Sequence, residues 1–321
     1  MFWLFTAWRE LKKAGILGIN RRNAACILDH NPRRLYPTVD DKLRMHELCQ
    51  EIGVPAPDIY EVIRTPAALR GISRKLAELD DFVIKPNRGS AGRGVLVITG
   101  RAGSAFLRHN GQLLETERIC QHVSDTLSGK YSLGGRPDVA LVQQRIDLHP
   151  GFRRLAYKGI PDIRIILYRN EPAMAMLRLP TKASSGRANL HQGGIGVGID
   201  LASGLAHHAM QRNRCILGHP DTGAPVIGFR VPNWQDVLWM SRRVAEAVGL
   251  GYIGVDIVID KRLGPMLLEA NARPGLAIQI ANARGLLPRL AEIDALLKRP
   301  REMSRPAIIG RIGDEGLRKS A

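Results

Sequence analysis

The stretch 252–275, YIGVDIVIDKRLGPMLLEANARPG, decides the fold. Its two apolar runs flank a short polar turn that ends in glycine, and this pattern predicts an antiparallel strand pair. A single charged residue, Asp256, interrupts the first run, whereas Glu269 and Asn271 stand at the end of the second. Because residues two apart on a strand share a face, we expect Glu269 and Asn271 to project together, within reach of Asp256 on the paired strand.

Three oxygen ligands that converge in this way suit Mg²⁺, which binds a few side chains together with phosphate oxygens and water. The alternative is that acidic residues at strand ends are solvated caps. An apolar strand that is interrupted once by aspartate, opposite Glu-x-Asn, disfavours this alternative. The pair therefore predicts a metal site at Asp256, Glu269 and Asn271.

A glycine-rich segment lies upstream, at residues 84–94, and reads IKPNRGSAGRG. Lys85 stands at the end of an apolar strand and is followed within ten residues by three glycines, a serine and two arginines. Glycines allow backbone N–H groups to approach phosphates, and lysine supplies a positive charge. The segment is neither a Walker loop nor a Rossmann motif, because a strand and not a helix follows it. It indicates a polyphosphate site, with an ordinary flexible hairpin as the alternative.

The composition bounds the class of protein. The chain has 321 residues, enough for two domains or for one domain of two lobes, and its 45% hydrophobic and 24% charged residues exclude wholesale disorder. Its longest apolar runs fall far short of the ~20 residues that span a bilayer. The four cysteines lie far apart with no CxxC pair, which disfavours a zinc module or a disulfide framework and indicates a cytoplasmic protein.

The formal net charge of +17 leaves two interpretations open. Either an arginine-rich surface has no specific role, or the partner is anionic: a nucleotide, an acidic peptide, a nucleic acid or a membrane surface. A nucleic-acid-binding protein would combine clustered basic residues with exposed aromatic ones. Aromatic residues make up only 5% of this chain, and several of them are near the N-terminus, so nucleic acid is disfavoured as a partner.

The remaining pattern predicts alternating short elements without internal repeats. Near the N-terminus, Phe2, Trp3, Phe5, Trp8 and Leu11 recur at helical spacing, which predicts an amphipathic helix that docks on protein rather than on a membrane surface. Residues 31–37 are expected to be irregular. We expect helices at 40–52, 66–79, 113–127, 234–248, 276–283 and 287–297, and strands at 58–63, 82–85, 95–98, 139–146, 162–168, 173–179 and 195–199.

Taken together, these motifs resemble the ATP-grasp superfamily, in the family's order, from about residue 40 to about residue 275. Lys42, in Asp-Lys at the start of a helix, is similar to the family's first phosphate-contacting lysine, and Lys85 to its second. LVQQRI at 141–146 stands where the adenine-binding hinge belongs. The nucleotide-binding residues that the resemblance implies are Lys42, Lys85, Arg88, Gly89, Ser90, Gly92, Gly94, Gln143, Gln144, Ile146 and Asn189.

The resemblance also implies catalytic residues. Arg164, in Asp-Ile-Arg, is similar to the arginine that faces the transferred phosphate, and NLHQGG at 189–194 resembles the family's Asn-x-x-x-Gly-Gly loop. Asp256, Glu269 and Asn271 match its magnesium triad. The catalytic residues that the resemblance implies are Arg164, Arg273 and His191.

The implied fold class is α+β: the ATP-grasp fold, in which two α+β lobes hold ATP between two mainly antiparallel sheets. The implied organisation is an N-terminal helix and extended segment (1–38), an N-terminal lobe (39–138), a C-terminal lobe with the magnesium site (139–300) and a tail (301–321). The N-terminal lobe carries the glycine-rich flap, residues 88–94. The chain is most similar to the alpha-L-glutamate ligase-like proteins, which combine features of the ribosomal-protein glutamate ligases and of the sugar-transfer-associated ATP-grasp group. Two departures are a hinge with glutamine where glutamate is usual and a short region before residue 40.

The resemblance implies an ADP-forming ligase that needs ATP and Mg²⁺, with Mn²⁺ as the alternative metal. Such an enzyme joins glutamate or a similar amino acid to a peptide or amino-acid acceptor through an acylphosphate. The implied partners are ATP and an amino-acid or acidic peptide substrate, and related ligases often assemble as homo-oligomers. The alternatives are an ATP-grasp phosphotransferase acting on a hydroxyl and, from another class, a basic nucleic-acid-binding protein.

Overall fold

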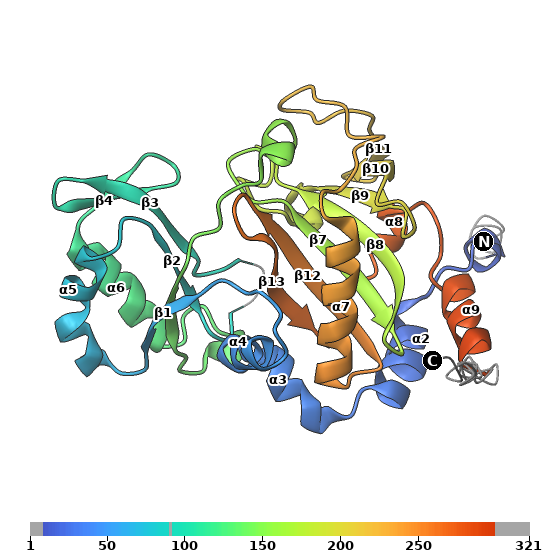
Figure 1. The fold of residues 1–321 in the computed structure, drawn as a ribbon, viewed down its shortest axis with the longest axis horizontal. Coiled ribbons are helices and arrows are strands. Elements are labelled where there is room, and N and C mark those ends of the chain that lie inside the picture. The colour runs from blue at the N-terminus through green and yellow to red at the C-terminus, as the bar shows by residue number, and fades with distance from the viewer. Residues whose placement is uncertain (1–8, 90–91, 299–321) are drawn as a thin grey trace, which may run out of the picture.

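The structure, a computed structural model, describes residues 9–89 and 92–298. Two antiparallel sheets form two lobes that stand side by side (Figure 1). The α+β class with two mainly antiparallel sheets, expected from the sequence, is confirmed. Within the described residues, no helix combines the length and apolar character that a bilayer crossing requires.

The first lobe is built on a six-stranded sheet in the order β1-β6-β2-β3-β4-β5. Helices α5 and α6 cover this sheet, because Ile119 and Val123 of α6 join a buried cluster with Phe82 and Ile84 of β2. The elements are β1 (Ile59–Ile63), α5 (Ile72–Ala77), β2 (Phe82–Pro86), β3 (Leu96–Ala102), β4 (Ala105–Arg108), β5 (Leu113–Leu114), α6 (Thr116–Leu127) and β6 (Ala140–Gln143).

The second lobe is built on a seven-stranded sheet in the order β11-β10-β9-β8-β7-β12-β13. Its elements are β7 (Asp162–Tyr168), β8 (Glu171–Leu179), β9 (Ile195–Ile199), β10 (Ala206–Gln211), β11 (Arg214–Cys215), α7 (Trp234–Val248), β12 (Tyr252–Asp260), β13 (Gly264–Asn271), α8 (Ile278–Ala281) and α9 (Leu287–Lys298).

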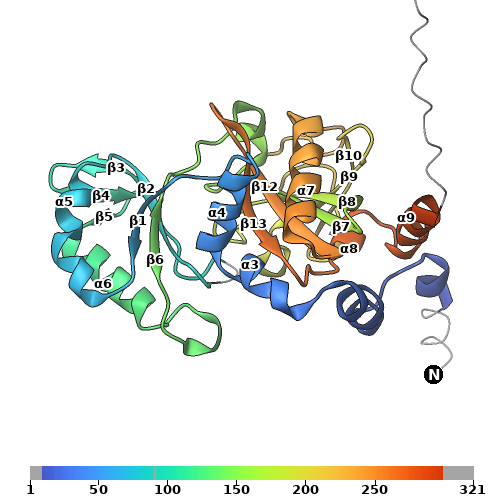
Figure 2. The ribbon, with the colours of Figure 1, turned by 60° about the horizontal axis from the view of Figure 1, so that its bottom comes forward.

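Both faces of the second sheet are covered, and the strand pattern explains why. Along β7, Ile163, Ile165 and Leu167 pack with α7 in one cluster, whereas Ile166 and Tyr168 pack with α8 and α9 in another. Successive side chains on a strand point to opposite faces, so the apolar run Ile165–Tyr168 needs helices on both sides. Figure 2 shows α7 on one side of the sheet and α8 and α9 beyond it.

Helix α4 (Lys42–Glu51) lies between the two sheets in both views (Figures 1 and 2). It follows α3 (Tyr36–Asp40), and its N-cap is Asp41, whose Oδ1 accepts hydrogen bonds from the backbone N–H groups of Leu43 and Arg44. An N-cap of this kind satisfies backbone donors that the first turn leaves free. The cap fixes where the helix begins and therefore where Lys42 stands.

Most predicted elements are confirmed, including helix α7 and the β12–β13 pair, but several boundaries were wrong. The predicted helix 66–79 begins as a 3-10 helix (Pro66–Gly71), and the predicted helix 113–127 begins at Thr116 because β5 precedes it. Tyr36 and Pro37, expected to be irregular, begin helix α3, and the predicted helix 40–52 is divided between α3 and α4. The remaining short helices are α2 (Ile19–Arg21), a π-helix (Arg22–Leu28) and 3-10 turns at Arg33–Leu35, Leu133–Gly135, Pro150–Leu155 and Leu190–Gln192.

The predicted N-terminal helix is described only in part. Residues 9–13 are helical, and Leu11 on this turn is exposed. The aromatic residues Phe2, Trp3, Phe5 and Trp8 lie outside the described residues. The role of this segment therefore stays a prediction.

Candidate active site

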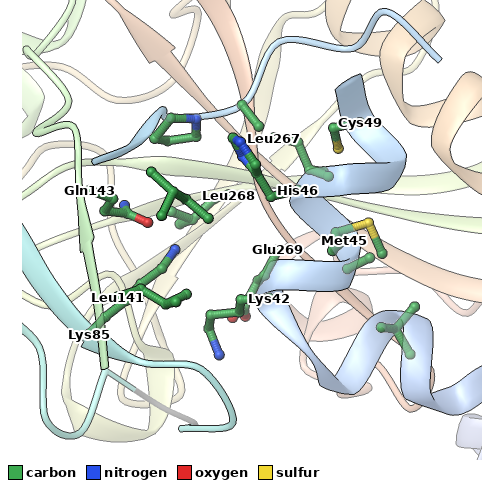
Figure 3. Close-up of a pocket in the computed structure, with 15 residues that line it drawn as sticks. Lys42, Met45, His46, Cys49, Lys85, Leu141, Gln143, Leu267, Leu268 and Glu269 are labelled. Carbon is green, nitrogen blue, oxygen red and sulfur yellow. The ribbon is translucent and has the colours of Figure 1, made fainter. Parts of the chain in front are cut away.

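Three cavities open where the two lobes face each other, and Glu269 lines all of them. The helix cavity is the smallest and lies against α4, β6 and β13 (Figure 3). The flap cavity, of about 260 Å³, lies under the glycine-rich segment and is lined by Gly89, Gly92 and Leu268. The arginine cavity, of about 580 Å³, is lined by basic side chains from both lobes.

A β-bulge in the β12–β13 pair sets the position of Glu269. Asp256 pairs with Glu269, but the next pair joins Ile257 to Leu267, so Leu268 has no partner in the ladder. An extra residue of this kind bends its strand and redirects the neighbouring side chains. As a result, the consecutive residues Leu268 and Glu269 both line the helix cavity and the flap cavity.

Two lysines from different elements reach the same space as Glu269. Figure 3 shows Lys42 on α4 and Lys85 on β2 beside Glu269 on β13. Lys42 Nζ donates to the carbonyl oxygens of Asn87 at 3.2 Å and Gly89 at 2.8 Å. Burial lowers the pKa of Lys85 to about 7; the charge of Lys42 acts in the same direction and that of Glu269 opposes it. Two lysines share this space with one carboxylate, and an anionic ligand would favour the charged form of Lys85.

Four charged residues form a buried chain on one face of the second sheet. Asp162 and Arg164 lie two apart on β7; Arg178 is opposite Asp162 on β8, and Asp256 is opposite Arg164 on β12. Arg164 donates to both oxygens of Asp256, at 2.7 and 2.5 Å. Arg178 bridges the two aspartates, with Nε on Asp162 and Nη2 on Asp256 at 2.6 Å.

The buried ion pairs shift the pKa values of Asp256 and of the neighbouring Glu269. Burial alone would raise the pKa of Asp256, but Arg164 and Arg178 lower it by more, so Asp256 is ionised at neutral pH. Burial raises the pKa of Glu269, and the charge of Asp256 raises it further, while Lys42 opposes both. The two carboxylates therefore differ: Asp256 is held by arginines, and Glu269 faces the cavities.

The donor set fits a magnesium ion that arrives with phosphates. The Glu269 side chain is 38% exposed, and its only ion pair among the described residues is a long contact of 3.9 Å to Arg164. Asn271 lines the arginine cavity, and its Oδ1 accepts one hydrogen bond, from the Arg273 backbone, so it keeps a lone pair. Asp256, by contrast, is fully buried, lines none of the three cavities and has both oxygens bound by Arg164 and Arg178. The described residues contain no group of three or more His, Cys, Asp or Glu side chains that could hold a metal, so an ion here would need the amide of Asn271 and oxygens from its own ligand.

The Asn-x-x-x-Gly-Gly loop contributes to two of the cavities. Asn189 lines the flap cavity and the arginine cavity, and its Oδ1 accepts a hydrogen bond from the backbone N–H of His191 at 3.0 Å. Gly193 adopts a φ of 100°, which favours glycine, and Gly194 donates to the carbonyl of Asn189. The exposed His191 lines the arginine cavity.

Contacts with the rest of the first lobe and with α4 hold both ends of the flap. At its start, Arg88 pairs with Asp41 at 3.3 Å, and the Arg88 backbone N–H donates to Asp138. At its end, Gly94 (φ 73°) packs against the Tyr131 ring, which a Cβ at this position would approach to 2.5 Å. Gly89 and Gly92 line the flap cavity, whereas Gly94 does not, and Ser90 lies outside the described residues.

The structure brings most of the predicted site residues together, but not all of them. The hinge residue Gln143 lines the helix cavity. Gln144 lines none of the three cavities, because its side-chain oxygen accepts a hydrogen bond from the Asp58 backbone N–H instead. Ile146 packs in a small cluster with Val258 and Met266. The predicted residues that line at least one cavity are Lys42, Lys85, Arg88, Gly89, Gly92, Gln143, Arg164, Asn189, His191, Glu269, Asn271 and Arg273.

Sequence reasoning missed several residues that line these cavities. Arg178 lines both the flap cavity and the arginine cavity; its signal was a single charge in the apolar run 173–179, a pattern similar to that of Asp256. Leu268 depends on the bulge, and Arg136 stands in a loop without a motif. Neither of these two left a pattern in the sequence.

Comparison with known proteins gives a family match over most of the chain. The family model described as sugar-transfer-associated ATP-grasp matches residues 21–295. A segment of 86 residues is 33% identical to cyanophycin synthetase of Crocosphaera subtropica, covering 25% of this chain and 10% of that protein.

Among solved structures, the ATP-grasp ligase PsnB complexed with a minimal precursor aligns with a TM-score of 0.46 at 17% identity, over 84% of this chain and 63% of that one. The D-alanine–D-alanine ligase of Bacillus anthracis, complexed with ATP, aligns with a TM-score of 0.44 at 14% identity, over 81% and 62%. The chain spans less than two thirds of the length of each of these relatives.

Proposed function

The chain belongs to the sugar-transfer-associated ATP-grasp family, and on that premise we propose that it is an ATP- and Mg²⁺-dependent ligase joining a carboxylate to an amine. One observation carries the proposal: the flap cavity and the arginine cavity share a wall that includes Lys42, Arg178 and Glu269. Phosphoryl transfer requires a nucleotide and an acceptor to meet end to end. Two adjoining cavities with cations at their junction suit that requirement.

In the proposed first step, a carboxylate oxygen of the substrate attacks the γ-phosphorus of ATP, and ADP leaves. The product is an acylphosphate. Negative charge crowds together in this step, so positive charge is the main catalytic requirement. Lys42 and Lys85 would bind the nucleotide phosphates, and Arg164 and Arg178 would face the moving phosphoryl group from the arginine cavity.

In the proposed second step, an amine attacks the acyl carbon and expels phosphate. Arg273 would bind a substrate carboxylate, because a guanidinium can bind a carboxylate through two parallel hydrogen bonds. His191, on the same cavity, would accept the amine proton if the amine arrives charged. The flap would exclude water, since an acylphosphate in contact with water hydrolyses.

Glu269 and Asn271 would hold Mg²⁺, which when bound supplies positive charge to the phosphate oxygens. Asp256, the third predicted ligand, would join them once an arginine releases one of its oxygens. The remaining predicted nucleotide contacts, from Gln143, Asn189 and the flap glycines, belong to the same proposal. We assign the lobes to residues 39–138 and 139–300, with β6 as the strand that the second segment contributes to the first sheet. The cytoplasm is the proposed compartment, because all four cysteines are free thiols.

The test is phosphate release from ATP and Mg²⁺, screened over amino acids and small peptides singly and in pairs. A ligase releases phosphate in proportion to amide product, and only when both carboxylate and amine are present. A phosphotransferase, which would use the same site, would instead yield a phosphorylated hydroxyl and no free phosphate. Product analysis by mass spectrometry separates the two reactions.

Glu269→Ala and Lys85→Ala should each abolish turnover while the far-UV circular dichroism spectrum is retained. Wild-type rates in folded Glu269→Ala protein would remove the magnesium assignment. Arg273→Lys should raise the KM for the carboxylate-bearing substrate, since the ammonium cannot reproduce two parallel hydrogen bonds.

A further inference from the structure

The arginine cavity carries more positive charge than its own residues neutralise. Six basic side chains line it, against two acidic ones, Asp40 and Glu269. The basic residues come from both lobes: Lys42, Arg88, Arg136, Arg164, Arg178 and Arg273.

Most of these cations already have partners. Arg164 and Arg178 are bound by Asp162 and Asp256, as described above. Arg88 pairs with Asp41, and Lys42 donates to backbone carbonyls. In the proposed function Lys42 binds nucleotide phosphates, and Arg164 and Arg178 face the moving phosphoryl group. These four cations are therefore engaged elsewhere than at a second substrate.

Arg136 and Arg273 are different. Both are exposed, and neither forms a salt bridge with any carboxylate among the described residues. The Arg273 guanidinium lies over the Tyr36 ring, 4.8 Å from its centroid, which orients the group without neutralising it. Arg136 is two residues before Asp138 in the same loop. The Asp138 carboxylate accepts hydrogen bonds from Ser132 Oγ at 2.8 Å and from the Arg88 backbone N–H at 2.9 Å. These bonds connect the loop of Arg136 to the start of the flap.

The two guanidinium groups line one cavity from opposite lobes, since Arg136 follows α6 in the first lobe and Arg273 follows β13 in the second. Like charges that share a cavity repel each other, and an anion bound between them offsets this repulsion. Arginine binds carboxylates through planar, paired hydrogen bonds, so each group can take one carboxylate.

We propose that the arginine cavity binds an acidic substrate with at least two carboxylates, one held by Arg273 and the other by Arg136. This inference rests on the proposed function and names the substrate class of its second cavity. Because Arg136 belongs to the first lobe and Arg273 to the second, a substrate with both carboxylates links the lobes. A substrate with one carboxylate would leave the lobes unlinked, which gives a structural basis for selectivity.

The first test is direct binding without nucleotide, followed by thermal melting and calorimetry. The probes are the dipeptide Glu-Glu, its amide analogue Gln-Gln, free glutamate and glycerol phosphate. Glu-Glu should raise the melting temperature and bind about ten- to hundredfold more tightly than Gln-Gln, the factor expected for a lost charge-assisted hydrogen-bond pair. Equal binding of Glu-Glu and Gln-Gln, or binding of glycerol phosphate alone, would overturn the proposal.

The second test assigns Arg136. Arg136→Gln should reduce the preference for Glu-Glu over Gln-Gln by about ten- to hundredfold, and Arg136→Glu should reverse it. The matched control is Arg74→Gln, which removes an exposed arginine of α5 that lines none of the three cavities and should leave the preference unchanged. A preference unchanged in Arg136→Gln, or affected equally in Arg74→Gln, would contradict the assignment.

These measurements are independent of turnover. If no combination of substrates releases phosphate while Glu-Glu still binds through Arg136, the proposed reaction fails and the binding inference stands. If phosphate is released with neutral substrates as efficiently as with acidic ones, the ligase stands and the substrate class is refuted.

Discussion

Replacing Asp256 with asparagine tests the buried ion chain. Asparagine has the same shape as aspartate but carries no charge, and its amide nitrogen is a donor placed against the donors of Arg164 and Arg178. Asp256 is 0% exposed and accepts three hydrogen bonds from these two arginines. The substitution therefore leaves two buried guanidinium groups short of one negative charge.

The size of the effect follows from this burial. Removing one partner of a buried ion pair typically costs about 3–5 kcal/mol, because the remaining charge stays buried. For an unfolding unit of about 150–250 residues, 1 kcal/mol shifts the melting temperature by roughly 2–4 °C. Asp256→Asn should therefore lower the melting temperature by about 6–20 °C, measured by circular dichroism without nucleotide or metal.

Glu269→Gln is the matched control on the paired strand. The Glu269 side chain is 38% exposed and its contact with Arg164 is 3.9 Å, so a neutral residue at this position should change the melting temperature by less than about 2 °C. The two variants should thus separate in stability while both lose ATP turnover. A melting temperature for Asp256→Asn within 2 °C of the wild type would refute the reasoning, as would equal losses in the two variants.

Three further predictions concern other parts of the molecule. The pKa of Lys85 is about 7 in the folded protein against 10.5 ordinarily, so the unfolded chain binds more protons between these values and Lys85 makes the free energy of unfolding rise with pH in that window. Urea titrations should show that Lys85→Met reduces this slope, with Lys42, whose pKa burial also lowers, contributing to what is left. Gly94→Ala should increase proteolysis of the flap more than Gly92→Ala does, because both glycines have positive φ but only Gly94 abuts Tyr131; equal cleavage would contradict the contact. Asn31→Ala, which removes buried hydrogen bonds to the backbone of β12, should cost about 1–3 kcal/mol in denaturant unfolding, and a cost near zero would be inconsistent with them.

The order of motifs along the chain was predictable because each motif is local. The β12–β13 pair, the glycine-rich segment and helix α7 are all defined by neighbouring residues, and the structure has each of them. The convergence of Glu269 with Lys85 followed only from the resemblance. No periodicity relates positions so far apart in the sequence.

Other features could not be predicted, for physical reasons. A β-bulge inserts one residue without a sequence signature, so the presence of Leu268 beside Glu269 in the cavities was not foreseeable. Asp256 was predicted as a metal ligand, and its two arginine partners come from strands whose pairing the sequence does not specify. The 3-10 start of the predicted helix 66–79 differs from an α-helix by one hydrogen-bond step, which hydrophobic spacing does not resolve.

The hydrogen bonds from Lys42 to Asn87 and Gly89 give the molecule a built-in spectroscopic reporter. An ammonium group has three donors, and two of them are on backbone carbonyls of the flap base. An anion that binds the Lys42 ammonium in place of these carbonyls breaks both hydrogen bonds, and water then hydrates the carbonyl oxygens. Carbon-13 labelling of the Asn87 carbonyl would then register occupancy of the cleft as a chemical-shift change, with no dye, no coupled enzyme and no knowledge of the natural ligand.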